Sequence, residues 1–127
     1  MLTKEQIFAA RDLQTEDVEV PEWGGSVRIS VMSGRVREAL MDALAEPQKT
    51  SRFQALMLSS TIVDDAGAPM FTTDDVEQLR EKNPDILTRL VEVAMRLNKI
   101  GAKATEEAEK NSEAAQSGSS GSDSPGS

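Results

Sequence analysis

The strongest constraint on the fold is an amphipathic helical pattern over residues 84–99. Asn83 is a good N-cap and Pro84 suits the first helical position, so the helix has a defined start. Its apolar residues recur with helical spacing and share one side: Ile86, Leu87, Leu90, Val91, Ala94 and Leu97. Val93 and Met95 widen this side beyond a narrow stripe. A face this broad is either entirely core or partly core and partly a surface for a partner.

The segment between residues 17 and 32 changes from helical spacing to alternation. Val18 and Val20 share one face of a first extended stretch, and Val27, Ile29 and Val31 share one face of a second. Residues 21–25, Pro-Glu-Trp-Gly-Gly, supply the turn, because glycine adopts positive φ at little steric cost. This pattern predicts a β-hairpin with one buried face. Two strands alone are marginal, so the hairpin must pack on helices or pair with another chain.

Four shorter helices are predicted around these two elements. Thr3 and Gln6 form a capping box for a helix over residues 4–10, which we expect to pack on the domain as a lid. Ser33 and Ser51 are the predicted N-caps of helices over residues 34–44 and 51–63, and a further helix spans residues 74–82. The predicted class is therefore α+β, with an N-terminal β-hairpin packed on a small bundle of about four to five helices.

The end of the chain has a different composition. Of residues 112–127, ten of sixteen are Ser or Gly, which cannot bury enough apolar surface to offset the entropy lost on ordering. We therefore expect one folded domain over residues 1–111 and a disordered tail over residues 112–127.

Composition limits the functions that the chain can perform. Its formal charge is −8, which disfavours nucleic acid and anionic membranes as partners. The apolar runs are short and no signal-peptide pattern opens the chain, so we expect a soluble, non-secreted protein. Histidine and cysteine are absent, which excludes the common nucleophile–base pairs and His or Cys metal sites. No catalytic residue, metal site or cofactor is predicted, and the protein is expected not to be an enzyme.

Two acidic pairs are the remaining candidates for catalysis. Asp64 and Asp65 fit a tight turn, and Asp74 and Asp75 fit the first turn of a helix, where the dipole favours negative charge. Their spacing does not match a calcium-binding loop. These structural roles explain all four residues, although an enzyme that used two converging carboxylates is an alternative.

The candidate partner-binding residues lie on the hairpin turn and on the helix over residues 84–99. Trp23, the only tryptophan, either folds back on the hairpin as core or stands out as an interface anchor. The solvent edge of the helix adds four further candidates: Arg89, Val93, Met95 and Arg96.

Several of these segments together resemble the tail assembly chaperones of long non-contractile-tailed phages. The most specific is Pro-Glu-Trp-Gly-Gly (residues 21–25) within the hairpin, followed by Ser33-Gly34 at a helix start. The turn over residues 63–67 leading to Met70-Phe71, the segment 73–76, the closing helix and residues 109–113 also fit, so the resemblance covers about residues 3–113.

The resemblance implies a non-enzymatic role in the host cytoplasm. Such chaperones bind the tape measure protein, keep it soluble, help to recruit tail tube subunits and are absent from the mature virion. The family commonly makes a longer product by ribosomal frameshifting, and the Ser/Gly-rich segment would then end the short product. Self-association of the chaperone is a further expectation.

Two other functions remain open on the residues alone. One is a structural phage protein, a head–tail connector or minor tail protein, which would be found in purified virions. The other is an acidic regulatory binding module whose surface mimics nucleic acid, which would bind a DNA-binding partner in a salt-sensitive way.

Overall fold

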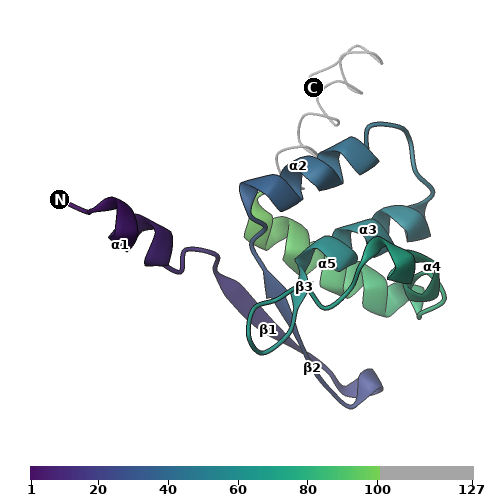
Figure 1. Ribbon diagram of the computed structural model, residues 1–127. Helices are drawn as coiled ribbons and strands as arrows, with labels where there is room; N and C mark the ends of the chain where they lie inside the picture. Colours follow the sequence, from purple (N-terminus) through teal and green to yellow (C-terminus); the bar gives the residue numbers. More distant parts are fainter. Residues whose placement is uncertain (101–127) are drawn as a thin grey trace, which may run out of the picture.

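The computed structural model describes residues 1–100 (Figure 1). The predicted domain end at residue 111 and the predicted tail over residues 112–127 lie outside this part of the chain. The described part confirms the α+β class. Its elements, in order, are α1 (Lys4–Ala9), β1 (Thr15–Val20), the 3-10 turn η1 (Pro21–Trp23), β2 (Gly25–Ser30), α2 (Gly34–Ala43), α3 (Thr50–Thr61), β3 (Ile62–Val63), the 3-10 turn η2 (Thr73–Asp75), α4 (Val76–Leu79) and α5 (Pro84–Asn98).

The three strands form one antiparallel sheet in the order β1-β2-β3. The predicted hairpin is confirmed: Val18 pairs with Val27, and the connection η1 ends at Gly24, whose φ is +82°. The third strand was not predicted, since it contains two residues that follow α3 directly and shows no alternation. Ile62 pairs with Ile29, which places the end of α3 beside the centre of the sheet.

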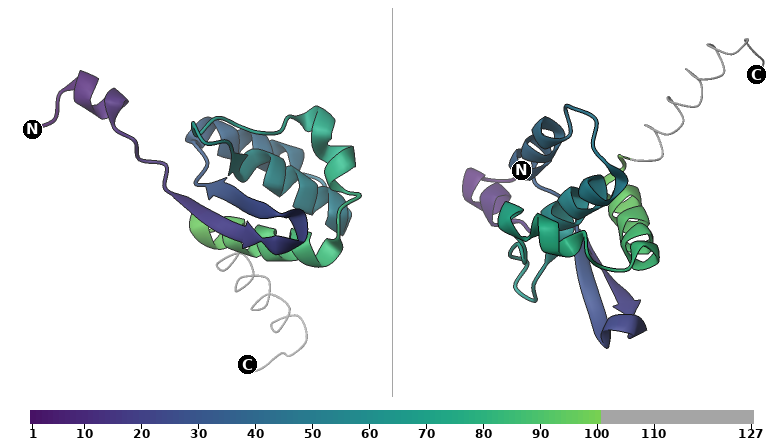
Figure 2. Two further views of the ribbon diagram at one scale, coloured as in Figure 1. Left: turned by 90° about the horizontal axis from the view of Figure 1, so that it is seen from below. Right: turned by 90° about the vertical axis from the view of Figure 1, so that its right-hand side faces the viewer.

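Helix α3 is the centre of the packing and contacts α2, α4 and α5 (Figure 2). Helix α5 lies against α3 and against both long strands. Its predicted apolar stripe is buried, except that Leu97 is partly exposed. The core contains Val20, Ile29, Met32, Leu40, Ala55, Leu56, Met57, Leu58, Ile62, Val76, Leu79, Ile86, Leu87, Leu90, Val91 and Ala94.

The predicted helix starts are mostly confirmed. The side chain of Asn83 accepts a hydrogen bond from the Asp85 N–H at 2.8 Å, and Ser33 accepts one from the Val36 N–H at 3.2 Å. The prediction that Ser51 is an N-cap was wrong, because the N-cap of α3 is Lys49, two residues earlier, and it makes no side-chain hydrogen bond. The Ser51 hydroxyl instead accepts a hydrogen bond from Arg80 Nε at 2.9 Å, so a tertiary contact replaces the local one.

The buried side chain of Asn98 joins the end of α5 to the junction between β2 and α2. Its Oδ1 accepts a hydrogen bond from the Met32 N–H at 2.7 Å. Its Nδ2 donates to the carbonyl oxygens of Ala94 at 2.8 Å and Ser30 at 3.3 Å. Buried backbone groups need such partners, so Asn98 takes the place of the ladder bonds that end with β2.

Helix α1 does not pack on the domain, so the prediction of a lid was wrong. None of its residues is buried, and the chain before β1 continues the line of that strand away from the helices (Figure 2). We call residues 1–13 the N-terminal arm. Its apolar side chains Ile7 and Phe8 are 54% and 80% exposed. The local capping box at Thr3 formed as predicted, but it specifies only where the helix starts and not where it packs.

Candidate protein-binding groove

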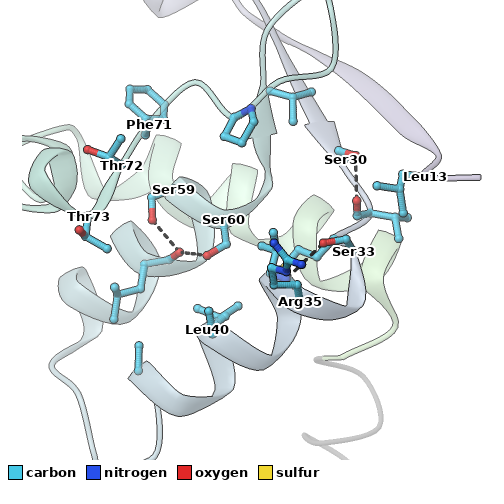
Figure 3. A pocket seen from close by; sticks show the side chains of 18 of the residues that line it. Leu13, Ser30, Ser33, Arg35, Leu40, Ser59, Ser60, Phe71, Thr72 and Thr73 are labelled. Atoms are coloured by element: carbon cyan, nitrogen blue, oxygen red, sulfur yellow. Dashed lines mark hydrogen bonds between the residues drawn. The ribbon is translucent and has the colours of Figure 1, made fainter. Parts of the chain in front are cut away.

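An apolar groove of about 510 Å³ lies between α2 and α3 (Figure 3). Two sides of the groove are built from helical stripes. On α2 the stripe is Val36, Ala39, Leu40 and Ala43, and on α3 it is Leu56, Ser59 and Ser60, after which Val63 of β3 continues that side. Small side chains at the facing positions leave the space that larger ones would fill.

The floor of the groove is formed by side chains that the core already holds. Leu40 and Leu56 are 3% and 5% exposed, so they cannot move out of the way easily. The hydroxyls of Ser59 and Ser60 both donate to the Leu56 carbonyl oxygen, at 3.0 Å and 2.9 Å. Because these hydroxyls are satisfied within the helix, the groove presents an apolar surface.

The third wall comes from the loop that follows β3. Pro69 bridges back to Val63, and the Met70 N–H donates to the Ile62 carbonyl oxygen at 3.2 Å. This pairing holds Phe71 over the groove, with Thr72 and Thr73 beyond it (Figure 3).

The turn that starts this loop is built as the sequence predicted. Asp64 Oδ1 accepts hydrogen bonds from the N–H groups of Ala66 and Ala68, both at 2.9 Å. Gly67 has a φ of +85°. At the next acidic pair, the Asp75 carboxylate accepts from the Thr72 N–H at 2.9 Å and caps η2. These local bonds give the carboxylates of Asp64 and Asp75 structural roles.

The lining of the groove is mainly apolar and carries little charge. Within residues 1–100 there is no group of three or more acidic, histidine or cysteine side chains that could hold a metal ion. In the same span, no helix has the length and apolar character needed to cross a membrane. Among the residues that line the groove, Arg35 carries the charge. A groove with these properties suits the apolar face of a helix.

The predicted partner residue Trp23 lies at the end of the hairpin and is 38% exposed. It is therefore not part of the core, contrary to one of its two interpretations. The Lys82 ammonium lies 5.7 Å from the centroid of its ring, within the range of a cation–π interaction.

The two predicted arginines on α5 form ion pairs with the hairpin. Arg89 donates to both carboxylate oxygens of Glu22, at 2.9 Å and 3.3 Å, and this hydrogen bonding lowers the pKa of Glu22 below its ordinary value. Arg96 donates to both oxygens of Glu16, at 2.8 Å and 3.0 Å. Both guanidinium groups therefore fasten α5 to the hairpin within the chain.

Val93 and Met95 are partly buried and pack against the core. None of the five predicted residues lines the groove between α2 and α3. Their role in partner binding stays a prediction. The groove was not predicted from the sequence. A signal for it was present, because Ala39 and Ala43 on α2 and Ser59 and Ser60 on α3 are small residues within the two helical stripes.

The described part of the chain is a small α+β domain with an apolar groove, and comparison with known proteins gives its family. The model of the phage tail assembly chaperone family matches residues 4–112, so the chain belongs to that family. This confirms the resemblance found in the sequence.

The chain is also similar to the solved structure of the bacteriophage HK97 tail assembly chaperone, with 24% identity and a TM-score of 0.55. The match covers 73% of this chain and 90% of that chain and shows a shared fold. No curated protein matches the sequence. Family and fold together support a role as a tail assembly chaperone.

Proposed function

We propose that this protein binds the tape measure protein of its phage and keeps it soluble during tail assembly. The observation that carries the proposal is the apolar groove between α2 and α3 in a member of the tail assembly chaperone family. The family resemblance implies a client that is a very long, helical and aggregation-prone chain, whose helices would present apolar faces. One such face would place its side chains against Leu40, Leu56 and Phe71.

Charge supports the same role. The chain carries a formal charge of −8, and like-charged complexes resist further association. A client segment whose apolar face is covered by an acidic protein is therefore less prone to aggregate. We place this activity in the host cytoplasm, with the chaperone absent from the mature virion and also helping to recruit tail tube subunits. Short and frameshifted longer products would divide these two tasks.

The test is co-expression with the tape measure protein of the same phage, followed by pull-down and a solubility assay. The groove variant is Ala39→Glu, which adds a carboxylate to an exposed position that lines the groove. Its matched control is Met41→Glu, which adds the same charge to the same helix outside the groove, at a side chain that is 39% exposed.

We expect the parent chain and Met41→Glu to keep the client soluble and to elute with it. Ala39→Glu should lose about tenfold in client affinity, because a carboxylate placed in an apolar contact surface is costly to desolvate even with Arg35 nearby. If the client is equally insoluble with and without the parent chain, the proposal is wrong. The chain should then be sought in purified virions, where a head–tail connector or minor tail protein would be found.

A further inference from the structure

The tip of the N-terminal arm carries apolar side chains that the rest of its own chain leaves exposed. Leu2, Ile7 and Phe8 are 71%, 54% and 80% exposed, whereas Leu13 at the base of the arm lines the groove of its own chain and is 45% exposed. Side chains of this kind are usually covered when several lie close together on one short segment.

Helix α1 is also too short to be stable in isolation. It has six residues, and isolated helices shorter than about 12–15 residues are marginal in water. Its capping box supplies a start signal, but most helical stability in proteins comes from packing an apolar face. Such a helix needs a surface to pack on, and the core of its own domain does not supply one.

We propose that the arm of one copy of this protein docks in the groove between α2 and α3 of a second copy. The two surfaces match in chemistry, since Ile7 and Phe8 are apolar and the groove floor is formed by Leu40 and Leu56. A phenyl ring and a branched side chain suit a groove whose walls carry the small residues Ala39 and Ala43.

The direction of the arm favours a second copy over the arm's own groove. The Val31 N–H donates to the Gln14 carbonyl oxygen at 2.8 Å, so the chain follows the sheet up to the start of the arm. Residue Ala10 ends α1 in an extended conformation, and the arm points away from the helices (Figures 1 and 2). Leu13 lines the groove of its own chain, so a fold-back of α1 would require the chain between Ala10 and Leu13 to reverse its direction.

Charge does not oppose this contact between two acidic molecules. The arm carries two basic side chains, Lys4 and Arg11, and two acidic ones, Glu5 and Asp12, so its formal side-chain charge is zero. It can therefore approach the partner copy without adding to the repulsion between chains of charge −8.

Because each copy has one arm and one groove, the contact can join copies head to tail. The arm would occupy the surface that we assign to the client, a consequence that rests on the proposed function. Binding of the client would then displace the arm and release the chaperone from its own assemblies.

The test uses the full chain without any client, so it does not depend on the proposed function. Phe8→Ser removes the largest arm side chain, and Ala39→Glu blocks the groove. Met41→Ser, which removes an exposed apolar side chain of α2 outside the groove, is the control. Oligomeric state is measured by sedimentation velocity for each protein over a concentration series. An equimolar mixture of Phe8→Ser and Ala39→Glu is measured in the same way.

We expect the parent chain and Met41→Ser to self-associate and both site variants to be monomeric. Loss of one buried phenyl ring should weaken association about 30-fold. The mixture should form a dimer that grows no further, because one intact arm meets one intact groove. A monomeric parent chain, an unaltered Phe8→Ser oligomer or a mixture that stays monomeric would each overturn the proposal. If the arm instead docks in the groove of its own chain, the parent chain, every variant and the mixture would all be monomeric.

Client binding separates the two proposals. If the arm competes with the client, Phe8→Ser should capture the tape measure protein at least as well as the parent chain does. If no variant captures the client but the mixture still forms dimers, the proposed function fails and the arm–groove contact stands.

Discussion

Replacing Asn98 by Ala tests whether the buried hydrogen bonds at the end of α5 hold the domain together. Asn98 is 5% exposed, and its Oδ1 is bound to the buried Met32 N–H at 2.7 Å. In Asn98→Ala this N–H loses its acceptor, and the Ser30 and Ala94 carbonyl oxygens lose a donor.

The expected loss of stability follows from these partners. An orphaned buried donor costs about 1–3 kcal/mol, and lost bonds to the two carbonyl oxygens add about 1 kcal/mol. We therefore expect Asn98→Ala to lower the free energy of unfolding by about 2–4 kcal/mol. Asn83→Ala makes the same substitution at the other end of α5, where the side chain caps an exposed helix start. It should cost about 1 kcal/mol.

Urea unfolding followed by far-UV circular dichroism measures both variants. With a slope of about 2 kcal/mol per molar urea, the middle of the usual range, Asn98→Ala should move the midpoint by about 1–2 M. Asn83→Ala should move the midpoint by about a quarter to a half as much, with the slope unchanged in both variants. The reasoning is refuted if Asn98→Ala costs no more than Asn83→Ala, since the buried network would then contribute nothing beyond a surface cap.

Three further predictions concern charge, backbone and core. The hydrogen bond from Arg89 lowers the pKa of Glu22 below its ordinary value of 4.5. The stability that this ion pair contributes is therefore present above pH 4.5 and is lost as the pH falls through the lower pKa of the folded state. In acid titrations, Arg89→Gln should therefore show a smaller loss of stability below about pH 4.5 than the parent chain. Gly67→Ala should cost about 1 kcal/mol in urea unfolding, because φ is +85° although space for a Cβ is open. Leu58→Ala should cost about 2–5 kcal/mol by thermal or urea unfolding, because its side chain is fully buried, and a smaller loss would show that the core relaxes around it.

The helix starts show how far local sequence can be followed. Asn83 and Ser33 act as predicted because a cap joins groups that are two or three residues apart. At Ser51 the same local argument failed, since Arg80 lies 29 residues away and still competes for the hydroxyl. A hydrogen bond between residues so far apart in the chain depends on the packing of α3 against α4, and a short stretch of sequence does not specify that packing.

The groove was not predicted from the sequence, and for the two predicted arginines on α5 the sequence indicated their position on the helix but not their contacts. Arg89 and Arg96 belong to the solvent edge of α5, as the helical period predicted. The hairpin supplies Glu22 and Glu16 as partners, 67 and 80 residues away in the chain, so these charges act within the molecule.

The hairpin, the long α5 stripe, the Asp64 turn and the α+β class followed from the sequence, because each depends on interactions between near neighbours or on a simple period. The third strand, the Asn98 network, the outward arm and the groove did not. Each depends on which surfaces meet when the chain packs: α2 and α3 carry small residues in matching stripes, and their approach makes a groove. The arm shows the same limit, because its capping box specifies a helix while the location of its packing partner is a property of the tertiary structure.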